Sequence, residues 1–284
     1  MTLELIHDYE LARHTWLGVG GKADYFGVVD SLDDLKYFLS QNTQPITILG
    51  GCSNVLIRDG GITGVVLKLG KDFQDIQVQD DCLICGAGAK LSKIAQIALK
   101  NNLTGFEFLA DIPGTLGGGL SSNAGAFSRS LSDCLLQLTA LDYKGQELVF
   151  DNFSNWSYRH NPLSGMIFTG AVLKAKGQAS YEQINALMSE YHLRRKTTQP
   201  QGVRTAGSTF KNTKEKSAGF LLENSGLKGY KENGAEMSAK HANFLINHHA
   251  TGNQLEDFVL KMQQIVFEKK GILLEMEIKC LGKR

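Results

Sequence analysis

The stretch Asp111-Ile112-Pro113-Gly114-Thr115-Leu116-Gly117-Gly118-Gly119 (DIPGTLGGG) decides the fold of this chain. Its Pro-Gly turn leads into three consecutive glycines, which are a poor choice for an ordinary helix because glycine loses the most conformational freedom on folding. The same glycines leave the backbone bare, so that a diphosphate or a flat ring can lie directly against it. The stretch therefore predicts a ligand site built from main chain.

Two further glycine clusters repeat this feature at Gly20-Gly21 and within Leu49–Asn54 (LGGCSN). Bare amides in such a turn can form an anion-binding nest, to which a Ser hydroxyl and an Asn amide add further hydrogen bonds. Neither cluster is a Walker loop or a GxGxxG fingerprint, so the pattern favours a non-Rossmann cofactor fold. Turn-rich β structure is the alternative explanation for these glycines.

The rest of the chain mixes helices and strands in an α+β pattern, with a domain boundary between 1–177 and 178–284. Apolar spacing and capping residues predict helices at 31–41, 91–101, 180–195, 218–223 and 253–270. Short apolar runs predict strands at 25–29, 46–49, 65–69, 243–247 and 272–281, and a hairpin over 135–150.

Composition excludes several classes of partner. The net charge of the 284 residues is +1, which gives no general attraction to nucleic acid or to an anionic membrane. The N-terminal segment has no export signal and no apolar run is long enough to span a bilayer, so we expect a cytoplasmic protein. The odd number of cysteines argues against a disulfide framework. Cys82 and Cys85 form a CxxC without a second pair, so we expect strand thiols and no metal site.

Eight blocks of sequence, in order, resemble the UDP-N-acetylenolpyruvoylglucosamine reductase family. They are His14–Ala23, Leu49–Leu69, Ile112–Phe127, Tyr158-Arg159, Ala206–Asn212, Ala218–Gly229, His241–Asn247 and Leu274–Gly282. The resemblance implies a PCMH-type (vanillyl-alcohol-oxidase-like) FAD-binding module of two α+β subdomains, followed by an α+β substrate-binding domain. The length is similar to that of the family's short form.

The resemblance also implies a reaction. NADPH, a co-substrate, reduces non-covalently bound FAD; hydride then passes from flavin N5 to C3 of UDP-N-acetylglucosamine enolpyruvate while a proton reaches C2, which yields UDP-N-acetylmuramate for peptidoglycan synthesis. No nucleic acid or membrane takes part, and we expect a monomer.

By residue-for-residue matching, three side chains take the family's catalytic positions. Ser208 is implied as the donor of the C2 proton and Arg159 as the brace of the substrate carboxylate, a task that suits a permanently charged planar fork. Glu277 is implied as part of the group that stabilises the enolate. Strand alternation alone leaves Glu275 and Glu277 on the same face and does not choose between them.

The same matching implies two sets of binding residues. The substrate contacts are Tyr158, Lys211 and Asn212. The FAD contacts are Gly20, Gly21, Gly50, Gly51, Cys52, Ser53, Asn54, Ile112, Pro113, Gly114, Thr115, Gly117, Gly118, Gly119, Asn123, Ala124 and Gly125. Cys52 departs from the family pattern, which usually has a third glycine there, and this puts the local geometry of the loop in doubt.

The sequence alone leaves two other functions as alternatives. The glycine blocks alone also suit a related FAD-dependent sugar or alcohol oxidase, although an oxidase has no need of the proton donor at Ser208. An inactive nucleotide-sugar-binding protein is the second alternative, and the presence of Arg159, Ser208 and Glu277 together argues against it.

Overall fold

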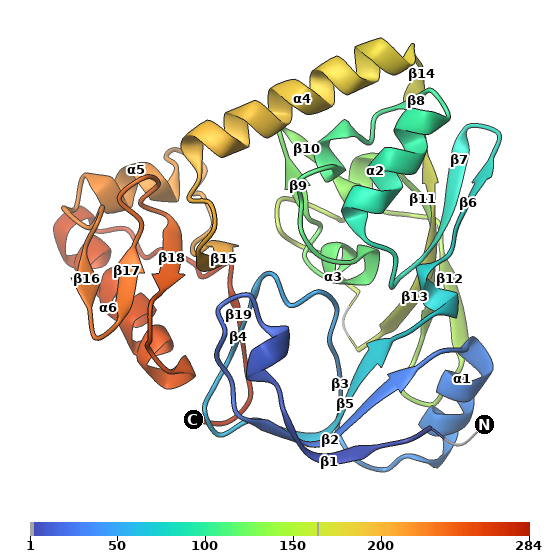
Figure 1. Ribbon diagram of the computed structural model, residues 1–284, viewed down its shortest axis with the longest axis horizontal. Helices are drawn as coiled ribbons and strands as arrows, with labels where there is room; N and C mark the ends of the chain where they lie inside the picture. The colour runs from blue at the N-terminus through green and yellow to red at the C-terminus, as the bar shows by residue number, and fades with distance from the viewer. Residues whose placement is uncertain (1–2, 164) are drawn as a thin grey trace. The chain divides into compact units, whose positions relative to one another are not determined.

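The computed structural model describes residues 3–163 and 165–284, and its elements are labelled in Figure 1. Contacts divide the chain into two compact units that are each discontinuous in sequence. The first unit contains 1–5, 27–51 and 66–194, and the second contains 6–26, 52–65 and 195–284. The sequence predicted domains at 1–177 and 178–284. That division differs from the two units defined by contacts, and it stays a prediction.

The first unit is built around a five-stranded antiparallel sheet in the order β12-β11-β13-β7-β6. Its strands are β6 (Ile76–Gln79), β7 (Cys82–Gly86), β11 (Leu135–Leu141), β12 (Glu147–Phe150) and β13 (Ile167–Lys174). The helices α2 (Leu91–Lys100) and α3 (Leu116–Leu120) both contact β7, and α3 also contacts β13. Figure 1 shows α2 beside β7. Buried side chains of both helices and of the sheet form one apolar core.

Smaller elements complete the first unit. Helix α1 (Leu32–Gln41) begins at Ser31, whose side chain accepts a hydrogen bond from the Asp34 N–H, as its capping sequence predicts. The short strands are β3 (Ile46–Ile48), β8 (Leu103–Thr104), β9 (Gly125–Ala126), β10 (Arg129–Ser130) and β14 (Gly177–Gln178). Helix α4 (Tyr181–Thr198) begins in this unit and ends in the second.

The second unit holds a four-stranded antiparallel sheet in the order β15-β18-β17-β16. Its strands are β15 (Arg204–Ser208), β16 (Lys231–Glu232), β17 (Ala235–Met237) and β18 (Phe244–Asn247). The helices α5 (Ala218–Glu223) and α6 (Gly252–Lys270) pack against each other, and α6 also packs against β17. A second apolar core lies between these elements.

The chain's N-terminal strands and its C-terminal strand also contribute to the second unit. Strand β1 (Ile6–Glu10) pairs antiparallel with β2 (Lys22–Val29), and β4 (Val55–Ile57) pairs parallel with β19 (Lys279–Leu281). Strands β2 and β5 (Ile62–Leu69) each begin in this unit and end in the first.

The α+β class predicted from sequence is confirmed, and so are the expected helices, within a few residues at their ends. Helix α6 ends at Gly271, which has the left-handed conformation (φ +67°) expected of a C-terminal glycine. The strand predictions were less accurate. The sequence did not predict β1, β6, β13, β15, β16 or β17. The strand expected over 272–281 is regular only at Lys279–Leu281, with an isolated bridge between Phe210 and Met276.

Candidate active site

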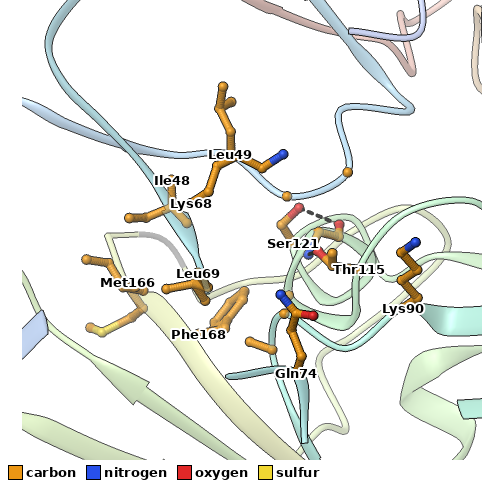
Figure 2. Close-up of a pocket in the computed structure, with 17 residues that line it drawn as sticks. Ile48, Leu49, Lys68, Leu69, Gln74, Lys90, Thr115, Ser121, Met166 and Phe168 are labelled. Atoms are coloured by element: carbon orange, nitrogen blue, oxygen red, sulfur yellow. Dashed lines mark hydrogen bonds between the residues drawn. The ribbon is translucent and has the colours of Figure 1, made fainter. Parts of the chain in front are cut away.

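A cavity of about 290 Å³ lies in the first unit, where the glycine loops meet the ends of β3, β5 and β13. Figure 2 shows the apolar side chains of Met166, Leu69 and Phe168 on one side of it and Thr115, Ser121 and Lys90 on the other. The cavity thus has an apolar wall for a flat ring and a polar wall of main chain. The full lining is Ile48, Leu49, Gly50, Gly51, Lys68, Leu69, Gln74, Ala87, Gly88, Lys90, Thr115, Gly117, Gly118, Ser121, Met166, Ile167 and Phe168.

The glycine loops of the cavity are packed so closely that they leave no room for side chains. A Cβ atom on Gly50 would lie 2.6 Å from Thr115 Oγ1, and one on Gly51 would lie 2.7 Å from Gly114 Cα. Real Cβ atoms do not make contacts this short, so each position needs glycine for a steric reason. The bare backbone of this loop pair is the cradle that a diphosphate would require.

The three glycines of α3 have different roles. Gly117 and Gly118 line the cavity, and Thr115 caps the helix by accepting a hydrogen bond from the Gly118 N–H. Gly119 is buried, and a Cβ there would lie 2.8 Å from Leu131. A Cβ on Gly117 would lie 3.1 Å from Ala87 Cβ, and the Gly117 N–H donates to the Ala87 carbonyl oxygen. Packing therefore constrains Gly119 and Gly117, whereas exposure of main chain to the cavity suits Gly118.

Five of the seventeen expected FAD contacts line the cavity: Gly50, Gly51, Thr115, Gly117 and Gly118. Among the others in the first unit, Ile112 packs against the apolar core and Gly114 is tightly packed against Gly51. Pro113 lies between them in the turn before α3. The sequence did not predict the apolar wall of the cavity. The apolar runs Ile46–Leu49 and Met166–Phe168, which contribute to this wall, were the signal that could have indicated it.

The expected FAD contacts of the second unit also have packing partners within that unit. Gly20 has φ +139° and lies against Ile57, while a Cβ on Gly21 would lie 2.1 Å from the Asp59 carbonyl oxygen. Cys52 is buried and has the left-handed φ of +50°, a conformation that a non-glycine residue rarely adopts. Ser53 follows Cys52 in this loop, before β4.

Asn123 anchors the loop that carries Tyr158 and Arg159. Its side-chain amide donates to Ser132 Oγ (3.0 Å) and to the Ser157 carbonyl oxygen (2.9 Å), and its Oδ1 accepts from the Ser132 N–H. Its residue surface is 1% exposed. Ala124 follows it and is partly buried. The buried Asn123 therefore ties the segment just before the candidate catalytic arginine to Ser132.

Arg159 itself is partly buried and has a left-handed backbone (φ +52°). Its Nη2 donates to the Gly125 carbonyl oxygen at 2.9 Å, and its guanidinium carbon lies 5.0 Å from the centre of the Tyr158 ring. Tyr158 is exposed. These contacts hold the guanidinium plane at a defined place in the first unit.

Ser208 and Glu277 lie on neighbouring segments of the second unit. Ser208 is the last residue of β15, and the carbonyl oxygen of the next residue, Thr209, accepts a hydrogen bond of 2.8 Å from the Glu277 N–H. The Asn54 amide donates to the Glu277 carbonyl oxygen at 3.0 Å. A hydroxyl and a carboxylate thus come from two paired segments that are far apart in sequence.

The environment separates Glu275 from Glu277, which strand alternation did not. The Glu275 side chain is 71% exposed and forms an ion pair with Lys211, whereas Glu277 is half-buried. A half-buried carboxylate suits a site role better than a solvated one. Of the two expected substrate contacts nearby, Lys211 holds Glu275, and Asn212 Oδ1 accepts from the N–H of Ala218 at the start of α5.

None of the five cysteines is part of a disulfide in the part of the chain that the structure describes, and burial raises the pKa of Cys85 and of Cys134 to about 12. No group of three or more His, Cys, Asp or Glu residues is placed to hold a metal ion in 3–163 and 165–284. No helix among these residues is long and apolar enough to cross a membrane.

Comparison with known proteins shows matches to two protein families. An FAD-binding domain family matches 28–151, and the C-terminal domain family of UDP-N-acetylenolpyruvoylglucosamine reductase matches 199–281. The reductase of that name from Rickettsia typhi is 44% identical over 282 residues, which are 97% of this chain and 95% of that protein. The Rickettsia massiliae reductase is 43% identical with the same coverage.

A solved structure is similar over the whole chain. The crystal structure of the reductase (MurB) from Thermus caldophilus superposes with a TM-score of 0.85 at 32% identity and covers 99% of this chain and 100% of that one. The fold, the glycine cradle and the matched FAD-binding domain define an FAD-binding oxidoreductase. Within that class, the chain belongs to the UDP-N-acetylenolpyruvoylglucosamine reductase family.

Proposed function

We propose that this protein reduces UDP-N-acetylglucosamine enolpyruvate to UDP-N-acetylmuramate, with NADPH as the source of hydride, in peptidoglycan precursor synthesis. The observation that carries the proposal is the match to reductases of this name over 97% of the chain. The bare glycine cradle beside an apolar wall supports the choice of FAD as the resident cofactor. We place the reaction in the cytoplasm and assign it to a monomer.

FAD, when bound, accepts a hydride from the nicotinamide and passes it to the enolpyruvyl group. The residues that line the cavity would bind FAD. The main chain of Gly50, Gly51, Gly117 and Gly118 would face the diphosphate, and Lys68 and Lys90 would add positive charge beside it. The residues Ile48, Leu69 and Phe168 provide an apolar surface for a ring.

Ser208 donates the proton that C2 of the substrate receives. A serine is a weak acid, but hydride addition makes C2 strongly basic, and a positioned proton donor is effective under these conditions. The proposed donor hydroxyl lies at the end of β15, where pairing of Ser208 with Phe244 fixes its backbone. Glu277, on the segment hydrogen-bonded to Thr209, completes the polar group around this proton.

Arg159 binds the substrate carboxylate. Hydride addition spreads negative charge over C2 and that carboxylate, and fixed donors aimed at developing charge lower the barrier without further reorganisation. The guanidinium is pre-organised by its hydrogen bond to Gly125 and by the Tyr158 ring. We assign Lys211 and Asn212 to the UDP portion and Tyr158 to the surroundings of the carboxylate.

Anaerobic titration tests this function directly. The purified protein is expected to carry a flavin, to lose its absorbance near 450 nm when NADPH is added, and to regain it when the enolpyruvyl sugar follows. Regained absorbance without stoichiometric UDP-N-acetylmuramate would contradict the proposal. The alternative, a sugar or alcohol oxidase, predicts that the reduced flavin is reoxidised rapidly by air and not by the enolpyruvyl sugar.

A further inference from the structure

The hairpin of β9 and β10 has an unfavourable turn. Ala126 pairs with Arg129, so the turn consists of Phe127 and Ser128 alone, and both have positive φ, +53° and +58°. Two-residue turns of this kind strongly prefer Asn-Gly or Gly-Gly, because other residues are strained at positive φ. Neither residue here is glycine or asparagine, so another interaction must hold the turn in this conformation.

That interaction is an aromatic stack on helix α4. The rings of Phe127 and Tyr191 lie parallel, with centres 3.8 Å apart and an angle of 6° between their planes. The guanidinium of Arg194, one helical turn further along α4, lies 5.7 Å from the centre of the Phe127 ring. All three residues belong to the first unit, in which Figure 1 places β9 and β10 beside α4.

The turn is directly connected to the candidate catalytic arginine. Gly125, two residues before Phe127, is the residue whose carbonyl oxygen accepts the hydrogen bond from Arg159 Nη2. Gly125 is held in the hairpin by its pairing with Ser130, so closely that a Cβ there would lie 2.1 Å from the Arg129 carbonyl oxygen. The position of the Arg159 acceptor therefore follows the position of the hairpin.

We propose that Tyr191 is a positioning residue: its ring holds Phe127 in the strained turn, and the hairpin in turn holds the Gly125 carbonyl that orients Arg159. The role of Arg159 on the substrate carboxylate rests on the proposed function. The stack of Phe127 on Tyr191 does not rest on the proposed function. It is a contact between two side chains, and the strain is a property of the backbone of the turn.

Tyr191→Ala and Tyr191→Phe separate positioning from other roles. We expect Tyr191→Ala to keep its flavin content and its rate of flavin reduction by NADPH, and to transfer hydride to the enolpyruvyl sugar roughly 10- to 100-fold more slowly, the loss typical of a misplaced group. Tyr191→Phe keeps the ring and is expected to retain the wild-type rate. Equal losses in both variants would assign the role to the hydroxyl and overturn the proposal.

Phe127→Ala provides the matched test at the other end of the stack. Alanine removes the ring and keeps the strained φ of the turn, so we expect a loss equal to that of Tyr191→Ala. The double variant is then expected to lose no more than either single variant, because contacting residues are not additive. Additive losses would overturn the proposal. Ser128→Gly, which relieves strain and keeps the ring, is expected to transfer hydride at the wild-type rate.

Stability measurements test the contact between the two rings without relying on catalysis. In urea unfolding, Phe127→Ala and Tyr191→Ala should shift the midpoint by less together than the sum of their separate shifts. Failure of the proposed function is recognised by a wild-type protein that never transfers hydride to the sugar. Failure of the positioning proposal is recognised by an active wild type whose Tyr191→Ala variant is equally fast.

Discussion

Glu277 and Thr209 are joined by a backbone hydrogen bond of 2.8 Å, from the N–H of Glu277 to the Thr209 carbonyl oxygen. This bond places the segment that carries Glu277 directly beside Ser208, the last residue of β15. The two residues are 68 positions apart in the sequence, so only tertiary structure brings them together. The arrangement gives the predictions for Ser208 and Glu277 a common structural basis.

Substitution Ser208→Ala removes the proposed proton donor and little else. Flavin reduction by NADPH should survive, while reduction of the enolpyruvyl sugar should fall at least about 10²-fold, the usual contribution of a positioned acid or base. Stopped-flow absorbance at 450 nm measures both steps separately. A parallel decrease in both would identify Ser208 as a structural residue.

Arg159→Ala should slow the second half-reaction by a comparable factor and leave the first intact, because the carboxylate loses its fixed partner. Arg159→Lys should restore little of the rate, since an ammonium lacks the planar fork. Arg13→Ala is a matched control, because Arg13 also lies over a tyrosine ring, at 4.2 Å from Tyr9. Unchanged turnover in Arg159→Ala would rule out the carboxylate contact.

Glu277→Gln and Glu275→Gln form a pair that decides which carboxylate acts. Glu277→Gln should lower the rate of sugar reduction by about tenfold or more. Glu275→Gln loses only an exposed ion pair with Lys211, whose net worth is about 0–1 kcal/mol, and should remain close to wild type. Single-turnover rates with both variants settle the assignment, and the reverse pattern would assign the role to Glu275.

Gly51→Ala should weaken FAD binding. The added Cβ would lie 2.7 Å from Gly114 Cα, and relieving such overlap costs about 1–3 kcal/mol, so we expect affinity to fall by a factor between about 5 and 150. Gly177→Ala is the control, since a Cβ at that position meets nothing within 4 Å. Quenching of FAD fluorescence on titration gives both dissociation constants, and equal affinity in the two variants would refute a steric role for Gly51.

Alkylation of Cys280 should depend steeply on pH. Burial raises its pKa to about 11, and the thiolate is the reactive form, so at pH 8 only about one molecule in 10³ is reactive. Labelling by iodoacetamide should therefore be slow at pH 8 and rise about tenfold per pH unit up to about pH 11. Mass spectrometry of the labelled peptide measures the rate, and a plateau below pH 9 would contradict the raised pKa.

Local sequence determined much of the secondary structure. Ser31 with Asp34 defines the start of α1 and Gly271 the end of α6, because caps depend on a few neighbouring residues. Strand β13 lies between β11 and β7, and most of its residues are buried. Its sequence therefore lacks the alternation of apolar and polar residues that indicates a half-buried strand, and it was not predicted. The strand expected at 272–281 follows the periodicity of its residues, yet pairs regularly only where β4 provides a partner, at Lys279–Leu281.

The sequence by itself predicted a glycine-lined ligand site in the first part of the chain, and the order of its motifs identified the family. Tertiary structure alone decided that Gly50, Gly51, Gly117 and Gly118 line the cavity, whereas Gly119 packs against Leu131 and Gly21 against Asp59. It also decided that Glu275 is solvated and Glu277 half-buried. The physical reason is that a glycine reveals only the absence of a side chain, while its neighbours in space are set by packing between distant segments.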